Sequence, residues 1–274
     1  GTNQIINKIY NKVIDELPKI NSKERTKSEL SELTLALQCG GSDSYSGITA
    51  NPALGFASDL LVQYGGSTIL SETPEIYGAE HLLIDRALKE SDIKKLINQI
   101  KWWKNYTQIN GGSLDNNPSP GNKKGGLTTI LEKSLGAVAK SGNSTMINVL
   151  DYAEKISEKG FHFMDSPGYD PVSVTGQVAS GSNLICFTTG RGSCFGFKPT
   201  PSLKISSNTN MYNNLEEDMD INAGTIMDGI HSIEEIGTKI FNELIEVASG
   251  KKTKSEINEY GDDEFNPWVI GATM

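Results

Sequence analysis

The stretch Leu37-Gln-Cys-Gly-Gly-Ser-Asp-Ser-Tyr-Ser-Gly-Ile-Thr-Ala-Asn-Pro52 joins a predicted buried strand to a predicted helix through a polar loop. The apolar run Leu33–Leu37 indicates the strand, which ends at the thiol of Cys39. Asn51 and Pro52 suit the N-cap and the first position of a helix. The two glycines after the thiol let the backbone approach a ligand closely. The loop is therefore either a well-capped turn or one wall of a binding site.

Composition bounds the class of protein. The chain has 274 residues, of which 36% are hydrophobic and 22% charged, as in ordinary globular proteins. A net charge of −9 argues against nucleic-acid binding, because phosphate contacts need clustered Lys and Arg. No stretch approaches the roughly 18 apolar residues of a membrane span. Three cysteines without framework spacing indicate the cytoplasm, and the Gly1-Thr2 start suggests a piece of a longer protein.

Strand and helix patterns alternate along the chain and predict one α/β domain over residues 1–274. Besides the strand ending at Cys39, strands are expected at Ser67–Leu70, Phe161–Met164, Asn183–Phe187 and Ser202–Ile205. Helices are expected at about 4–17, 51–64, 73–89, 91–109, 127–140, 145–157, 172–179 and 232–249, with a shorter one from 253. The spacing implies a mostly parallel sheet with right-handed crossovers. We expect the tail, 261–274, to dock against the body through Trp268.

Polar or glycine-rich segments follow every predicted strand. These segments are Cys39-Gly-Gly, Ser71-Glu72, Asp165-Ser166, Thr188-Thr-Gly-Arg191 and Ser206-Ser-Asn208. In an open parallel sheet, ligands bind outside the carboxyl ends of the strands. The sequence therefore predicts one site at this edge of the sheet.

Several residues at this edge are candidate metal ligands. Cys39, Glu72, Glu75 and His81 lie on the first two strand ends and the helix that follows, and soft or borderline divalent metals take such ligands. His81 also fits an ordinary helix histidine with one buried nitrogen. Asp43 disfavours a free thiolate at Cys39, which favours a metal ligand over an unassisted nucleophile. The chain has no CxxC or HxxxH spacing, which argues against a structural zinc site.

Two further segments offer positive charge. Arg191, with the hydroxyls of Thr188 and Thr189, suits a carboxylate or a phosphate. In the loop 115–126, Lys123 and Lys124 could bind a second anion or act as a base, or could simply be an exposed turn. This loop lacks the GK[ST] ending of a Walker A motif, and neither glycine-rich loop matches GxGxxG.

The sequence resembles the large domain of altronate and galactarate dehydratases nearly from end to end. The motifs that carry the resemblance are Gln38–Asp43 with Ile48–Pro52, Ser71–His81, Asn117–Leu127, Glu132–Ser134, Phe187–Gly192 and Asp218–Gly224. The stretch Asp165–Ser173 and the turn Lys198–Pro201 look more like the altronate branch. Sulfolactate sulfo-lyases resemble the same domain more distantly.

The resemblance implies a Rossmann-like sheet flanked by many helices and an iron-dependent lyase that dehydrates a sugar acid. It favours D-altronate, giving 2-dehydro-3-deoxy-D-gluconate and water, over galactarate or sulfolactate. It implies Fe²⁺, with Mn²⁺ or another divalent cation as the alternative. It also implies an upstream N-terminal β-clip domain, absent from this chain, or a small partner subunit. The rival class is a non-catalytic sugar-acid or nucleotide-binding module, or a regulatory subunit of a split enzyme. Trp102 and Trp103 fit the core or a homodimer interface, with the core favoured.

For this chemistry we assign three groups of residues. The expected metal ligands are Cys39, Glu72 and His81. The expected substrate-binding residues are Gly40, Gly41, Ser42, Asn51, Asn122, Thr188, Thr189 and Arg191. The candidates for proton transfer are Lys123, Lys124, Asp43 and Asp170.

Overall fold

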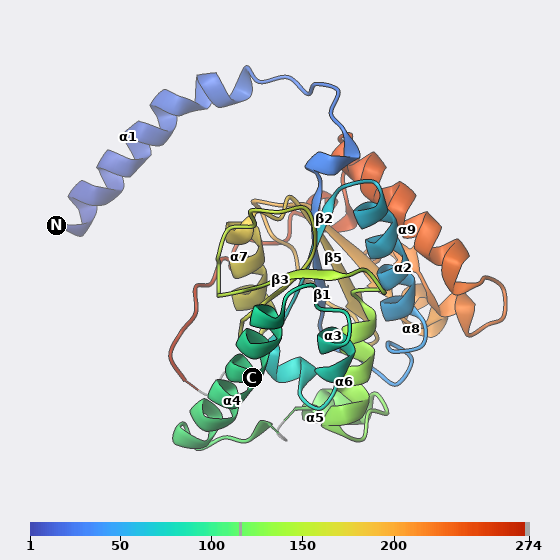
Figure 1. Cartoon of the computed structure of the whole chain (residues 1–274). Coiled ribbons are helices and arrows are strands. Elements are labelled where there is room, and N and C mark those ends of the chain that lie inside the picture. Colours follow the sequence, from blue (N-terminus) through green and yellow to red (C-terminus); the bar gives the residue numbers. More distant parts are fainter. Residues whose placement is uncertain (115–116, 272–274) are drawn as a thin grey trace.

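Seven parallel strands form one sheet in the order β3-β4-β2-β1-β5-β6-β7. The computed structural model describes residues 1–114 and 117–271. Helices lie on both faces of this sheet (Figure 1). The predicted α/β class with a mostly parallel sheet is confirmed.

The strands are β1 Thr34–Cys39, β2 Ser67–Ser71, β3 Met146–Leu150, β4 Gly160–Met164, β5 Leu184–Thr189, β6 Ser202–Ser206 and β7 Ile221–Asn222. The α-helices are α1 Thr2–Asn21, α2 Ala50–Gln63, α3 His81–Ile84, α4 Glu90–Ile109, α5 Pro120–Lys124, α6 Ile130–Ala139, α7 Asp170–Ser180, α8 Thr209–Asn214, α9 Ile233–Ala248 and α10 Lys254–Ile257. Short 3₁₀ helices are η1 Leu30–Glu32, η2 Thr73–Ile76 and η4 Gly224–Ile226.

Alternation along β1 distributes its side chains between two cores. Leu35 and Leu37 pack with α2, α4 and α9 in the larger apolar cluster. Ala36 faces the opposite side, where it packs with Val174 of α7 and with β5. Successive side chains of a strand point to opposite faces, so both faces of this central strand are buried.

Two predicted helices are wrong. The segment 145–157 contains the edge strand β3, followed by irregular structure. The segment 73–89 is broken into η2 and α3, because Gly78 between them has φ of 87°. Strand β7 was not expected, and neither was helix α5, which lies within the predicted loop 115–126. Part of the predicted loop 115–126, namely 115–116, lies outside the described residues, as do 272–274 of the tail.

The tail docks as expected: Trp268 stacks on Trp103, with ring centroids 5.2 Å apart. Trp103 is fully buried, which confirms it as a core residue, whereas Trp102 is 46% exposed. Helix α1 projects away from the body (Figure 1). It buries none of its residues against the described part of the chain, and Ile6, Val13 and Leu17 stay exposed. Within the described residues, no helix combines the length and apolar character that crossing a membrane requires.

The strand order reverses direction beside β1. The chain runs from β1 outward to β2 on one side, and later from β5 outward to β6 on the other. Such a reversal opens a crevice at the carboxyl ends of the two central strands. Cys39 and Thr188 are paired at these ends, and the backbone N–H of Gly40 donates to the carbonyl of Thr188. The polar loops after the strands therefore meet over this crevice.

Candidate active site

Three buried side chains with metal-binding atoms meet at this edge. Cys39 stands at the last position of β1, and Glu72 and Glu75 lie in the segment directly after β2. One ligand atom of each lies within 4.8 Å of the others. The Sγ of Cys39 is 3.7 Å from Oε2 of Glu75. The structure thus joins Cys39 and Glu72, both predicted from strand ends, with Glu75.

Glu72 has an unusual backbone conformation. Its φ of 76° lies in the left-handed region, which is unusual for a residue other than glycine. It is 1% exposed, yet neither of its carboxylate oxygens has a hydrogen-bond partner among the described residues. Burial, followed by the charge of Glu75, raises its pKa well above the ordinary value. An unpaired buried carboxylate is unfavourable unless a ligand completes it, and a divalent cation fits this set of thiol and carboxylate donors.

Two lysines of α6 and its C-cap approach the cluster from the other side. The Nζ of Lys140 donates to Sγ of Cys39 at 2.9 Å, and Lys140 is fully buried. The Nζ of Lys133 lies 2.6 Å from Oε1 of Glu75 and 2.6 Å from Oδ1 of Asn117. The seven-residue separation of the lysines places both on one face of the helix.

Burial and charge act on these groups in opposite directions. Burial raises the pKa of Cys39 to about 11, although the ammonium of Lys140 opposes the shift. Burial alone would also raise the pKa of Glu75, but Lys133 and Lys140 outweigh it and hold that pKa below its ordinary value. The pKa of each lysine is raised, because the neighbouring acidic groups outweigh burial. Both lysines are therefore ammonium ions at neutral pH.

A cavity of about 200 Å³ opens beside the cluster. Its walls include Cys39, Glu75 and Lys133, and Asp170 at the start of α7. The Oδ2 of Asp170 lies so close to Gly40 that a Cβ at this position would collide with it, so the glycine is needed for this contact. Burial, with the charge of Glu75, raises the pKa of Asp170 to about 7. The cavity therefore holds a group that can exchange a proton near neutral pH.

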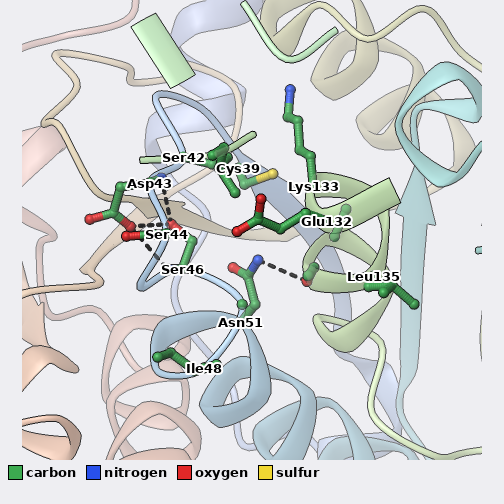
Figure 2. A pocket seen from close by; sticks show the side chains of 14 residues that line it. Cys39, Ser42, Asp43, Ser44, Ser46, Ile48, Asn51, Glu132, Lys133 and Leu135 are labelled. Atoms are coloured by element: carbon green, nitrogen blue, oxygen red, sulfur yellow. Dashed lines mark hydrogen bonds between the residues drawn. The ribbon is translucent and has the colours of Figure 1, made fainter. Parts of the chain in front are cut away.

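A second cavity, of about 260 Å³, lies between the loop after β1 and α6. Figure 2 shows Ser42 and Cys39 on one wall and Glu132, Lys133 and Leu135 on the other. Cys39, Ser42 and Lys133 line both cavities. These three side chains are thus reached from two sides.

Asp43 has a structural environment. Its Oδ1 accepts hydrogen bonds from the backbone N–H and the hydroxyl of Ser46 and from the hydroxyl of Ser207. Its Oδ2 accepts from the side-chain amide of Asn208. This carboxylate joins the loop after β1 to the segment after β6, which suits it to holding the loop rather than to moving a proton.

The predicted substrate-binding residues fall into two sets. Gly40, Gly41, Ser42 and Asn122 line the smaller cavity, and the amide of Asn122 donates to the carbonyl of Ser42 at 2.9 Å.

In the second set, the hydroxyl of Thr188 donates to Oδ1 of Asn51 at 2.6 Å, and the hydroxyl of Thr189 accepts from the N–H of Gly192. These groups are buried and hydrogen-bonded within the fold, and Asn51 also lines the second cavity (Figure 2). Arg191 is exposed, and its guanidinium lies against Gly121 in α5, beside the cavity wall.

Three other predicted residues lie outside the cluster. His81 is exposed at the start of α3 and is not part of the group of metal-binding atoms. Lys123 and Lys124 are exposed on α5. The lysines that contact the cluster are instead Lys133 and Lys140. Lys133 lies inside the Glu132–Ser134 motif. Its separation of seven residues from Lys140 places both on one helix face, and this spacing could have indicated both lysines from the sequence.

The amino-acid sequence of this chain is similar to those of known sugar-acid dehydratases. The sequence model of the family "D-galactarate/Altronate dehydratase, C-terminal" matches residues 30–273. The chain is 45% identical over 236 residues to galactarate dehydratase (L-threo-forming) of Escherichia coli K12, covering 86% of this chain and 45% of the relative. It is 41% identical over 253 residues to altronate dehydratase of Bacillus subtilis 168, covering 92% and 50%.

A third relative, altronate dehydratase of Escherichia coli K12, is 38% identical over 242 residues, covering 88% of this chain and 48% of the relative. The chain therefore spans about half the length of these relatives. Galactarate and altronate dehydratases both occur among them, so identity alone does not select the altronate branch. The match nevertheless covers nearly the whole chain, and this protein belongs to the D-galactarate/altronate dehydratase family, whose C-terminal domain it matches.

Proposed function

We propose that this chain carries the catalytic centre of a hydro-lyase that removes water from a sugar acid. The single observation that carries the proposal is the buried carboxylate of Glu72, which has no hydrogen-bond partner in the described part of the chain and lies beside Cys39 and Glu75. Lys133 and Asp170 line the cavity next to these three residues. A cation site and two proton-transfer groups around one cavity are the parts that dehydration beside a carboxylate needs.

The proposed metal ligands are Cys39, Glu72 and Glu75, with Fe²⁺ as the proposed ion and Mn²⁺ or another divalent cation as the alternative. The thiol with two carboxylates forms a mixed donor set that suits a borderline divalent ion. A cation bound there would act as a Lewis acid toward the substrate carboxylate and its neighbouring hydroxyl. His81, proposed from the sequence, is replaced by Glu75 in this set because His81 is exposed.

The proton-transfer roles follow from the charge of each group. Asp170, with a pKa of about 7, is ionised for a large part of its time at neutral pH and can remove the proton on the carbon next to the carboxylate. Lys133 remains an ammonium, so it can protonate the departing β-hydroxyl, which leaves as water. The resulting enol becomes the 2-keto-3-deoxy acid. Lys123 and Lys124 are not used, because both are exposed away from the cluster.

The substrate is proposed to lie against the backbone of Gly40 and Gly41, with Ser42 and Asn122 as polar contacts. Arg191 extends over α5 beside this cavity and offers a guanidinium to a carboxylate. A glycine is needed at position 40 because a side chain there would collide with Asp170.

The first substrate proposed is D-altronate, which would give 2-dehydro-3-deoxy-D-gluconate and water. The stretch Asp165–Ser173 and the turn Lys198–Pro201 favour it over the alternatives. Galactarate is the second candidate, because the galactarate dehydratase relative shares 45% of the aligned residues. Sulfolactate is a third acid to be tested.

The active assembly is proposed to include a partner. The chain spans about half the length of its relatives, so an upstream N-terminal domain or a separate small subunit would supply the rest. The exposed apolar residues of α1, including Ile6, Val13 and Leu17, support a contact with such a partner. A homodimer is the alternative, and light scattering of the purified chain separates the two.

The test is to add Fe²⁺ and each sugar acid under anaerobic, reducing conditions, with and without the partner domain, and to measure keto-deoxy acid. We expect product from one hexonate or hexarate, with less or none from sulfolactate. Tight binding of the acid without turnover, with the partner present, would establish a non-catalytic binding module instead. Anomalous scattering at the iron edge from a soaked crystal tests whether Cys39 is a ligand.

A further inference from the structure

The segment that carries Glu72 is held by the residues directly after β4. The backbone N–H of Glu72 donates to the hydroxyl of Ser166 at 3.0 Å, and the N–H of Thr73 donates to the carbonyl of Ser166 at 3.1 Å. The hydroxyl of Thr73 donates to Oδ1 of Asp165 at 2.5 Å. Three hydrogen bonds thus join two successive residues to the neighbouring strand end.

These bonds oppose a backbone preference. The left-handed φ of Glu72 is unfavourable for a residue with a side chain, and such a conformation persists only where its surroundings enforce it. A flip of this residue to ordinary backbone angles would turn its carboxylate away from Cys39 and Glu75. The bonds to Asp165 and Ser166 therefore preserve the grouping of the three donors.

Asp165 is itself held by Trp103, which in turn stacks against Trp268. The indole N–H of Trp103 donates to the same Oδ1 of Asp165 at 2.7 Å. The ring of Trp268, in the C-terminal tail, lies parallel to Trp103 at an interplanar angle of 2°. Trp103 is fully buried and Trp268 is half-buried, so the tail covers the outer side of this support. None of these three residues touches the donor cluster.

We propose that Asp165, Trp103 and Trp268 are positioning residues that set the affinity of the Cys39, Glu72 and Glu75 site for a divalent cation. Thr73 transmits the support, because its hydroxyl bonds to Asp165 and its backbone follows Glu72. The C-terminal tail thereby influences the metal site, although Trp268 packs against α4 and does not line the cavity. This inference rests on the metal role assigned under the proposed function.

The test uses Co²⁺ as the probe and the intact chain. The absorption band of a cobalt–thiolate bond reports the coordination of Cys39, and titration gives the dissociation constant. Thr73→Val removes the hydroxyl without changing the shape, and we expect it to weaken Co²⁺ binding about tenfold, as outer partners of metal sites commonly do. Thr73→Ser keeps the hydroxyl and should bind nearly as the parent protein does. Trp103→Phe should match Thr73→Val. Tyr64→Leu is the control, because it removes a stacked aromatic pair, with Phe241, that includes neither Trp103 nor Trp268.

Trp268→Leu serves if Trp103→Phe fails to fold, because Trp268 lies in the half-buried tail. We expect it to weaken Co²⁺ binding about two- to tenfold, the range that loss of one stacked aromatic pair can produce. Equal affinity for the parent chain, Thr73→Val and Trp268→Leu would overturn the inference. Failure of the parent chain to give the thiolate band would overturn the metal site itself, and with it the proposed function.

Discussion

The Nζ of Lys140 lies 2.9 Å from the Sγ of Cys39, and both side chains are buried at the centre of the cluster. Lys140 donates to a sulfur whose own pKa is raised by burial, so the pair joins an ammonium to a group that is a thiol when no cation is bound. A buried ammonium needs nearby negative charge. Glu75 supplies it, because the two lysines hold its pKa low, and this charge ties Glu75 and Lys140 into one electrostatic unit beside Cys39.

Replacing Lys140 with methionine tests this unit. Lys140→Met keeps most of the volume but removes the cation, so Glu75 loses one of the two charges that stabilise its ionised form. We expect the metal-free protein to lose about 3 kcal/mol in the free energy of unfolding, the order seen when one partner of a buried ion pair is removed. A divalent cation should restore more stability to this variant than to the parent, because it replaces the lost positive charge. Denaturant unfolding with and without Mn²⁺ measures both effects.

Lys124→Met is the matched control for this substitution. Lys124 is exposed on α5, and we expect its loss to change the free energy of unfolding by no more than about 0.5 kcal/mol. Equal stability of Lys140→Met and the parent, or no extra gain on adding the cation, would contradict the electrostatic unit.

Glu72→Gln should separate stability from cation binding. The pKa of Glu72 is higher in the folded protein than in the unfolded chain. Its contribution to the free energy of unfolding is therefore fully present below the pKa of the unfolded chain. That contribution is lost as the pH rises through the pKa of the folded protein. Glutamine does not ionise, so the metal-free variant should unfold at a higher temperature than the parent at pH 8, and the difference should shrink toward pH 4. A gain of about 1–2 kcal/mol is expected at pH 8, because glutamine removes a carboxyl group whose ionised form is favoured in the unfolded chain and disfavoured by burial in the fold.

The same variant should bind Co²⁺ at least about tenfold more weakly, because it loses an anionic ligand. Thermal unfolding from pH 4 to pH 8 and a Co²⁺ titration check the two parts. Glu90→Gln, at an exposed position of α4, is the control and should change neither. A Glu72→Gln variant that is less stable at pH 8 and binds Co²⁺ normally would show that Glu72 is structural.

The sheet could be predicted because its strands are short apolar runs that end in polar loops. The edge strand β3 could not, since Met146, Val149 and Leu150 also have the spacing of a helix face. Ile147 and Asn148 are only partly buried at that edge, so the continuous apolar pattern of a central strand is missing. Strand β7, with two residues, is too short to leave a periodic signal.

The site residues that lie at or directly after the strand ends could be predicted from the sequence. Cys39 and Glu72 come together because β1 and β2 are neighbours in a parallel sheet. Lys133 and Lys140 come from a helix, where a lysine in an amphipathic pattern is usually solvated, and only packing against the cluster buries them. His81 follows Glu72 closely in sequence, but after the break at Gly78 its side chain is exposed at the start of α3, whereas Leu83 of the same helix is buried.

Lys133→Met tests the assignment of the acid. The loss of a positioned proton donor should lower kcat about 10²- to 10⁴-fold in an assay of keto-deoxy acid formation. Lys133→Arg keeps the charge beside Glu75 but donates a proton poorly, so it should recover cation binding without recovering kcat. Lys123→Met, on the exposed face of α5, should leave kcat unchanged. A large loss with Lys123→Met and none with Lys133→Met would return the role to the loop lysines.

The Asp170→Asn variant tests whether Asp170 is the base, through the pH dependence of kcat. Because the pKa of Asp170 is about 7, the fraction able to accept a proton rises tenfold per pH unit below pH 7 and levels off above it. We expect kcat of the parent enzyme to follow that curve between pH 5 and pH 9. Asparagine fills the same space beside Gly40 but cannot accept the proton, so kcat should fall about 10²- to 10⁴-fold and lose this limb of the profile.

The Asp170→Asn variant should lose activity but gain thermal stability. This combination distinguishes the loss of a base from damage to the fold. A raised folded pKa means that Asp170 stabilises the protein fully below its unfolded pKa near 4, and that this contribution disappears as pH rises through about 7. Asp170→Asn should therefore unfold at a higher temperature than the parent above pH 7 while being nearly inactive. Thermal unfolding at pH 5 and pH 8 beside the kcat profile measures both. A variant that keeps the acidic limb of the profile would place the base at another residue, because the titrating group would still be present.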